Sequence, residues 1–214
     1  MQLSRDLSVD YKSAFVLLHK AREAIELACD AGALSGSVEV DGAYFGGYVK
    51  PANERKDRKD RRKKINQSGK RQSVIVMRER GGRTLTHVTR TEAEGVALIA
   101  ANVEHGTTVH ADEASHFDKL AAYFPIKRIN RQEAYSKDGA CTNQAESFFS
   151  RLRRAEIGTH HRIAGQYLGA YAAEMAWRED NNRQDNGTQF TMAVAASVAA
   201  PVSSRWCGYW QRRA

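Results

Sequence analysis

The chain has 214 residues, of which 42% are hydrophobic and 27% charged, so it can bury one substantial core and a small accessory element. Lysine and arginine outnumber aspartate and glutamate by 33 to 25, and the net charge of +8 favours a polyanionic partner such as nucleic acid. The odd number and wide spacing of Cys29, Cys141 and Cys207 suggest neither a disulfide framework nor a zinc knuckle, and no apolar run is long enough to span a bilayer. We therefore expect a soluble, unexported protein in a reducing cytoplasm.

The first predicted elements are helical. Residues 2–9 are typical of a short helix and a tight turn, and apolar residues spaced by about 3.6 predict an amphipathic helix over 10–28, capped by Asp10. This element, over 1–30, is either the end of a helix-turn-helix that presents Tyr11 and Lys12 to DNA or a hairpin that only packs on the main domain. A linker of small residues is expected over 31–37.

The stretch VEVDGAYFGG, residues 38–47, predicts a half-buried strand, because apolar residues recur at or near period two. Two carboxylates, Glu39 and Asp41, interrupt this pattern. A strand that closes with Gly46 and Gly47 can hold Asp41 rigidly at the edge of a sheet. Asp41 is therefore a candidate metal ligand that needs partners elsewhere in the chain.

The next segment, 53–64, has eight basic and three acidic residues, a net charge of +5. Such a run cannot bury itself and predicts a solvated loop or hairpin tip. It is either a solubilising loop or a clamp on the phosphate backbone of DNA, and its position directly after the Asp41 strand favours the clamp. The candidate DNA-binding residues of this loop are Arg55, Lys56, Arg58, Lys59, Arg61, Arg62, Lys63 and Lys64.

The following elements alternate between strands and helices. Residues 72–80 and 82–90 predict two antiparallel strands joined at Gly81–Gly82. A Thr91-x-x-Glu94 capping box predicts a helix to about Val103. A strand ending at Asp112, a short helix over 115–123, a strand over 126–130 and a helix from about Thr142 complete the order.

The helix from Thr142 carries the most informative motif, CTNQAESFFSRLRR. A carboxylate next to its apolar flank is unusual unless it is paired. If Glu146 projects toward Asp41 and Asp112, the three carboxylates can hold two divalent cations, with Mg²⁺ as the natural choice and Mn²⁺ as a substitute. Each acid alone would more simply form a surface ion pair. Residues spaced by 3, 4 and 3 share one helix face: Asn143, Glu146, Ser150 and Arg153.

These motifs resemble those of one group of bacterial insertion-sequence transposases of the DDE superfamily, which carry a zinc ribbon and a helix-turn-helix ahead of an RNase H-like domain. The group's V-D-E-x-Y-x-G-G pattern is matched at Val40 to Gly47, with Gly42 in place of the acidic neighbour, and its second acid at Asp112. Its N-x-x-E-x-F motif is matched at 143–148, and Glu146 follows Asp112 by 34 positions. The tail also fits, at Gly158 to His161 and at Tyr171 to Arg183.

The resemblance implies an α/β fold, an RNase H-like mixed sheet flanked by helices, over 38–185, followed by a C-terminal helix and tail over 186–214. It implies a two-metal reaction in which Asp41 bridges both ions while Asp112 and Glu146 hold one each. A water cuts one strand at the transposon end, and the 3′-hydroxyl then attacks target DNA. Some relatives use Asn at the third position, so Asn143 is a second candidate, but we expect Glu146.

The resemblance also implies that Arg153 contacts a phosphate near the scissile bond, and it adds Arg154 to the DNA-binding residues. The partners expected are double-stranded DNA and, on paired ends, a second copy of the chain, with the protein located at the bacterial nucleoid. His160 and His161 are either phosphate contacts or structural. The cysteines supply no zinc ribbon, so we expect an N-terminal truncation. A nonspecific metal-dependent nuclease and an inactive DNA-binding remnant remain alternatives.

Overall fold

Five strands form one mixed sheet in the described part of the chain. The computed structural model describes residues 2–29, 32–47, 49, 51–60, 63–66, 69–130, 136, 139–160, 162–203 and 205–208. The strand order is β3-β2-β1-β4-β5, in which β1 pairs antiparallel with β2 and parallel with β4. The strands are β1 (Ser37–Phe45), β2 (Gln72–Glu79), β3 (Thr84–Thr89), β4 (Thr108–Asp112) and β5 (Ile126–Ile129).

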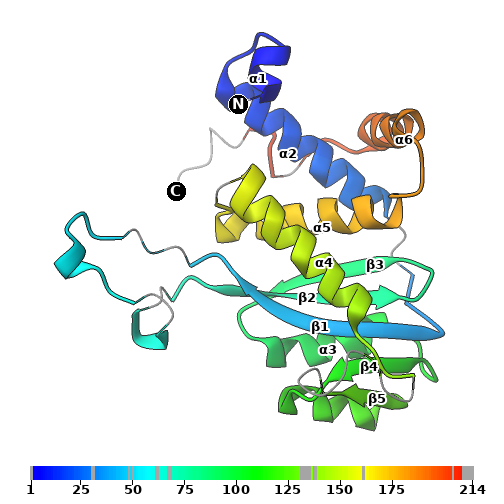
Figure 1. Cartoon of the computed structure of the whole chain (residues 1–214). Helices are drawn as coiled ribbons and strands as arrows, with labels where there is room; N and C mark the ends of the chain where they lie inside the picture. The colour runs from blue at the N-terminus through cyan, green and yellow to red at the C-terminus, as the bar shows by residue number, and fades with distance from the viewer. Residues whose placement is uncertain are drawn as a thin grey trace.

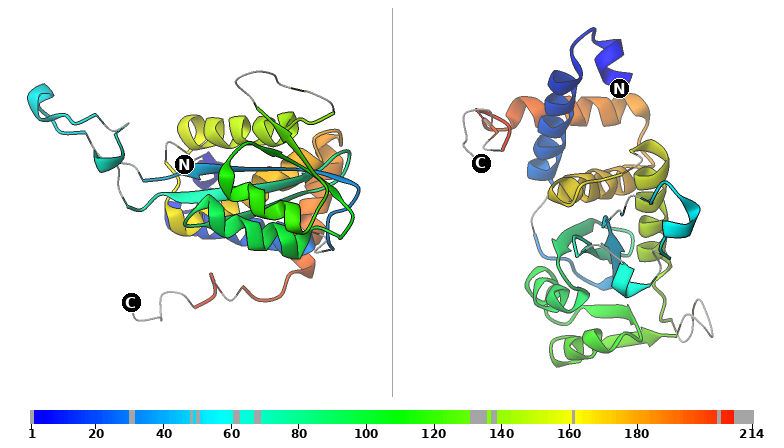
Figure 2. Two further views of the ribbon diagram at one scale, coloured as in Figure 1. Left: turned by 90° about the horizontal axis from the view of Figure 1, so that it is seen from below. Right: turned by 90° about the vertical axis from the view of Figure 1, so that its left-hand side faces the viewer.

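Helices cover both faces of this sheet (Figure 1). The α-helix α3 (Gly95–Asn102) and the 3-10 helix η4 (Ser115–Ala122) pack on one face, and α4 (Asn143–Arg154) and α5 (Gly165–Asp180) pack on the other. This mixed α/β architecture is compatible with the RNase H-like fold expected from the sequence. Figure 2 shows the layers from two further sides.

Alternation along β1 divides its side chains between two hydrophobic cores. Val38 and Val40 belong to the cluster with α3 and η4, whereas Ala43 and Phe45 belong to the cluster with α4 and α5. Because successive strand residues point to opposite faces, Glu39 and Asp41 share the face that α4 covers. Both carboxylates therefore lie at the contact between β1 and α4.

The N-terminal helices pack above the α5 layer. The α-helix α2 (Tyr11–Ala28) follows the short α1 (Gln2–Asp6) and contacts α5 and α6 (Asn186–Ala199). Asp10 caps α2, as predicted, by accepting hydrogen bonds from the backbone amides of Lys12 and Ser13. This packing agrees with the hairpin interpretation, while the role of Tyr11 and Lys12 in DNA binding, like the division into domains, stays a prediction. No helix in the described ranges is long and apolar enough to cross a membrane.

Several local expectations are met and one is corrected. The β2–β3 hairpin, β4, β5 and α4 lie where the sequence placed them. The predicted capping box is wrong: the Thr91 side chain makes no cap hydrogen bond, and Glu94 Oε2 accepts instead from the Arg90 amide at 3.1 Å. The chain consequently forms a 3-10 turn, η3 (Glu92–Glu94), before α3 begins. The short helix expected over 115–123 is present as the 3-10 helix η4.

The basic run forms an arm that projects from the end of the β1–β2 pair (Figures 1 and 2). It contains two short 3-10 turns, η1 (Arg55–Asp57) and η2 (Lys64–Asn66), and Arg58 hydrogen bonds to the carbonyls of Ala52 and Asn53. The side chains of Arg55, Lys56, Arg58, Lys59 and Lys63 are exposed, as expected of a solvated loop. Arg61 and Arg62, and the side chain of Lys64, lie outside what the structure describes.

Candidate active site

Asp41 lies near the middle of β1, and its residue is only 5% exposed. Its Oδ1 accepts a hydrogen bond from the Gly42 amide at 2.8 Å. A buried carboxylate on the inner face of a sheet is rare unless it is paired or binds a cation. Asp41 therefore occupies a position where a negative charge requires a partner.

Glu39, two residues earlier, is fully buried and binds the N-terminus of α4. Its Oε2 accepts from the backbone amides of Gln144 at 2.8 Å and Ala145 at 3.3 Å, while its Oε1 accepts from Arg80 Nε at 3.0 Å. The first amides of a helix have no partner within the helix, and its N-terminus attracts negative charge. Glu39 thus supplies the cap that the Thr142 side chain does not.

Arg78 of β2 and Arg80, the residue directly after β2, extend this polar contact between the sheet and the helices. Arg80 also donates to the Cys141 carbonyl at 3.2 Å, and its Nη2 lies 3.3 Å from Nδ1 of His110. Burial, with the adjacent Arg80 charge, lowers the pKa of His110 to about 4. Arg78 Nε donates to Gln144 Oε1 at 2.9 Å, so Arg78 and Arg80 together hold the start of α4.

A cavity of about 920 Å³ opens between β1 and α4, beyond this anchored end. Asp41 and Glu146 both line it, so the structure brings together the first and third predicted acids. The volume is that of a ligand site rather than of a packing defect, and it is large enough for a nucleotide. Its other lining residues are Gly42, Ala43, Phe149, Ser150, Arg153, Arg154, Ile157 and Gly158.

Strand β1 and helix α4 run in the same direction along this cavity. Glu39 contacts the start of α4, the Phe45 ring lies 6.0 Å from the Phe149 ring, and Arg153 lies 5.9 Å above the Phe45 ring. Glu146, Ser150 and Arg153 share one helix face, as the spacing predicted, and all three line the cavity. Asn143 is exposed and is not among the lining residues.

Asp112 ends β4, the strand next to β1. The parallel register pairs Glu39 with His110, and β4 then continues for two residues to Asp112, as β1 does to Asp41. By alternation Asp112 points to the α4 face, although it does not line the cavity, and its Oδ1 accepts from the Ala114 amide at 3.1 Å. No three His, Cys, Asp or Glu side chains within the described ranges stand close enough together to hold a metal ion. The three-carboxylate metal site therefore stays a prediction.

Glu92 is an acid near the site that the sequence analysis assigned no role. A Cβ built on Gly42 would lie 2.6 Å from Glu92 Cγ, so glycine at this position leaves room for the glutamate side chain. Glu92 Oε2 lies 3.6 Å from His116 Nε2. Burial chiefly raises the pKa of Glu92, and the nearby Asp112 charge raises it further. Glu92 thus lies behind Gly42, on the opposite face of the sheet from Asp41.

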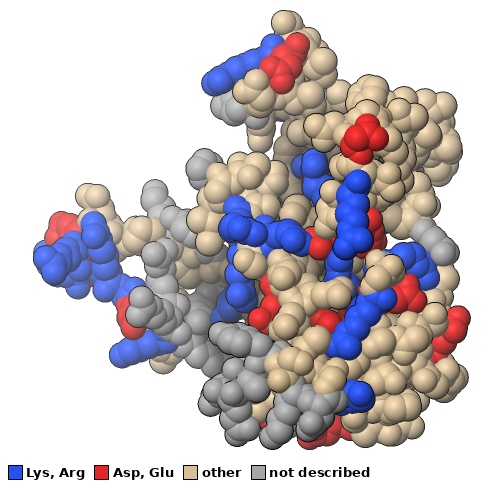
Figure 3. Space-filling view, turned by 45° about the vertical axis from the view of Figure 1, so that its right-hand side comes forward, with Lys and Arg blue, Asp and Glu red and all other residues tan. Residues whose placement is uncertain are grey.

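The remaining candidates separate into rim and structural residues. Arg153 and Arg154 are exposed at the cavity, and basic side chains also gather on the arm (Figure 3). His160 packs edge-on against Tyr171 with ring centroids 4.5 Å apart, and burial lowers its pKa, which favours the structural interpretation. His161 lies outside the described residues. Trp177 is half-buried on α5.

The comparisons with known proteins give one positive finding. Residues 33–180 match the ISXO2-like transposase domain. The chain belongs to the ISXO2-like transposase family. Neither the curated proteins nor the solved structures give a match.

Membership of this transposase family makes the chain a DNA-processing protein of the DDE type, as the motifs suggested. The matched residues include Asp41, Asp112 and Glu146 together with the whole arm. Carboxylate oxygens are the ligands that Mg²⁺ and Mn²⁺ prefer, so the chemistry of this donor set fits a divalent cation. Helices α1, α2 and α6 lie outside the matched range.

Proposed function

We propose that this transposase cuts one DNA strand at the end of an insertion sequence and joins the new 3′ end to target DNA. The observation that supports this most directly is that Asp41 and Glu146 line one large cavity whose rim is basic. Asp112 ends β4, the strand that pairs with β1, and we take it as the third acid of the site. The cavity therefore combines groups that attract cations with groups that attract phosphate.

In the first step, a water oxygen bonds to the scissile phosphorus and the bond from phosphorus to the 3′ oxygen breaks, leaving a 3′-hydroxyl and a 5′-phosphate. In the second step, the 3′ oxygen bonds to a target phosphorus and the target strand breaks at its own 3′ oxygen. Asp41, Asp112 and Glu146 would hold the divalent cations. Bound there, such ions would lower the pKa of water and stabilise charge on the leaving oxygen.

The chain's own side chains position the DNA for these steps. Arg153 and Arg154 are exposed at the rim, where they donate to backbone phosphates and fix the strand without reading its sequence. The Arg153 guanidinium lies 5.9 Å from the centre of the Phe45 ring, where a cation–π attraction favours its place at the cavity. Glu39 holds the α4 N-terminus on β1 and so sets the position of Glu146 relative to Asp41.

The test uses the purified chain and a labelled duplex that carries the end of the DNA element encoding it. Reactions with Mg²⁺, Mn²⁺ or EDTA are scored for nicking and for joining to a plasmid. We expect metal-dependent nicking and joining, both lost in Asp41→Asn and Glu146→Gln and lowered in Asp112→Asn. Asn143→Ala serves as a comparison, because we expect Glu146 rather than Asn143 to be the ligand.

The outcome separates the alternatives. Nicking without joining or preference for the element end would favour a nonspecific nuclease. Salt-sensitive binding without any nicking would favour an inactive DNA-binding remnant. Full activity in all three acid variants would refute the assignment of the site.

A further inference from the structure

A second cavity lies where the arm leaves the sheet, and it is lined by basic side chains. Its volume is about 700 Å³, and no acidic side chain is among its lining residues. Four cationic residues from three segments line it: Lys70, Arg71, Arg90 and Arg162. Four like charges around one cavity repel one another, so the arrangement favours an anionic ligand.

The polar groups of this cavity suit an anion as well. It includes Gly165 and Gln166, so the first turn of the 16-residue helix α5 faces it. Amides at a helix N-terminus lack partners within the helix and attract negative charge. Gln72 lines the same cavity, and its Oε1 atom is buried without a hydrogen-bond partner among the described residues. A half-turn of this amide presents Nε2, which donates to an anionic oxygen.

Glycine at position 165 permits this arrangement. A Cβ built there would lie 2.5 Å from Gln72 Oε1, so any larger residue would displace the amide from its present place. The cavity thus depends on a close approach between the end of β2 and the start of α5. Two cationic side chains at its edge, Arg90 and Arg162, are exposed and accessible to a large ligand.

The cavity lies along a path from the candidate active site to the arm. Asp41 lines the first cavity, and Gly47, beyond the end of β1, lines the second. The four steps from Asp41 to Phe45 alone cover roughly 13 Å at about 3.3 Å per residue. This equals about four base pairs of B-DNA at roughly 3.4 Å each, so a ligand in the second cavity is not the scissile phosphate.

We propose that this cavity binds the phosphodiester backbone of duplex DNA that flanks the cleavage point, at least about four base pairs away. The inference rests on the proposed function for the identity of the DNA. It adds a phosphate site between the active-site rim and the arm. DNA bound along Arg153, this cavity and the arm would follow one continuous basic surface.

The test measures the salt dependence of DNA binding by the full chain in EDTA, where no cleavage occurs. A fluorescent duplex of about 30 base pairs is titrated at several NaCl concentrations, and each phosphate contact contributes about 0.9 to the slope of log K against log salt. The variant Arg90→Ala/Arg162→Ala should lower the slope by about 2. Its loss of affinity between about 50 and 200 mM salt should be roughly tenfold smaller than that of the wild type.

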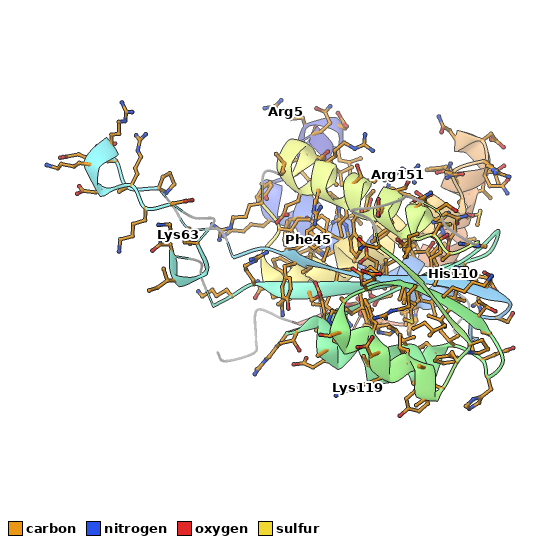
Figure 4. All side chains as sticks on the ribbon, turned by 60° about the horizontal axis from the view of Figure 1, so that its bottom comes forward. Arg5, Phe45, Lys63, His110, Lys119 and Arg151 are labelled. Atoms are coloured by element: carbon orange, nitrogen blue, oxygen red, sulfur yellow. The ribbon has the colours of Figure 1, made fainter. Side chains whose placement is uncertain are left out.

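Two controls accompany this measurement. Arg90→Lys/Arg162→Lys keeps both charges and should keep most of the slope. Lys119→Ala removes an exposed charge from η4, on the side of the sheet away from α4 (Figure 4), and should leave the slope unchanged. Circular dichroism checks that each variant is folded, as we expect for exposed side chains.

A wild-type slope in the alanine variant would overturn the inference, as would an equal loss of slope in Lys119→Ala. A lowered slope together with absent end cleavage would support the phosphate site and refute the proposed transposase activity. Normal end cleavage together with a wild-type slope in the alanine variant would support the proposed transposase activity and refute the phosphate site. If the wild type bound no duplex at all, both proposals would be wrong.

Discussion

Replacing Glu39 with glutamine tests whether this buried acid determines the position of α4. The substitution keeps the shape of the side chain but removes its charge, and it replaces one acceptor oxygen with a donor. That donor must face either Arg80 Nε or the amides of Gln144 and Ala145, all of which already donate to Glu39. At least one buried donor therefore loses its acceptor.

The magnitude follows from these contacts. Loss of a charged helix cap costs about 0.5–2 kcal/mol, and breaking a buried ion pair costs about 3–5 kcal/mol when one partner is removed. Arg80 is 29% exposed at its side chain, so solvent compensates part of its loss. We expect a decrease of about 2–4 kcal/mol in the free energy of unfolding. For a chain of this size, the melting temperature should fall by roughly 5–15 °C.

Urea denaturation at pH 7 measures the change, with Glu104→Gln as an exposed control that should differ from wild type by less than about 0.5 kcal/mol. A double-mutant cycle of Glu39→Gln with Arg80→Met isolates the pairwise energy, which should exceed about 1 kcal/mol. In the cleavage assay, Glu39→Gln should raise the Mg²⁺ concentration needed for half-maximal nicking more than it lowers the maximum. A stability change below about 0.5 kcal/mol would refute the proposed role of the cap.

Three further predictions concern single features. Gly42→Ala should destabilise the chain by about 1 kcal/mol in urea unfolding, because its Cβ would displace Glu92, and adding Glu92→Ala should restore stability. Burial lowers the pKa of His19 to about 4, so the stability that its neutral ring contributes is present above pH 6.5 and is lost as the pH falls toward 4. The free energy of unfolding of the wild type should therefore fall more between pH 7 and pH 5 than that of His19→Phe, by about 2 kcal/mol. Lys56→Ala/Lys59→Ala should lower the salt slope of DNA binding by about 2 without changing the melting temperature, whereas an unchanged slope would favour a solubilising arm.

Features set by neighbouring residues were predictable from the sequence. The Asp10 cap of α2, the β2–β3 hairpin and the shared face of Glu146, Ser150 and Arg153 all depend on residues within a few positions of one another. The spacing of Glu39 and Asp41 also placed both acids on one face of a strand. The role of Glu39 was not predictable, because its partners Gln144 and Ala145 are more than 100 residues away in sequence.

Competition between local signals explains the incorrect capping box. Thr91 and Glu94 have the right spacing, but Thr89 Oγ1 donates to the Thr91 carbonyl and Glu94 binds the Arg90 amide. These bonds end β3 and begin a 3-10 turn in place of an α-helical N-terminus. The side chain of Glu92 then lies against Gly42, a contact between two segments that no sequence period could reveal.

The order of residues along one face of β1 connects the fold to the proposed chemistry. Glu39 holds α4, Asp41 lines the first cavity, Phe45 packs beneath Arg153, and Gly47 reaches the basic second cavity. A shift of one residue in the register of this strand would turn all of the face-specific side chains to the α3 face. The site therefore depends on β1 being paired on both sides, by β2 and β4, and this places the acids in an interior strand, where the register is most firmly fixed.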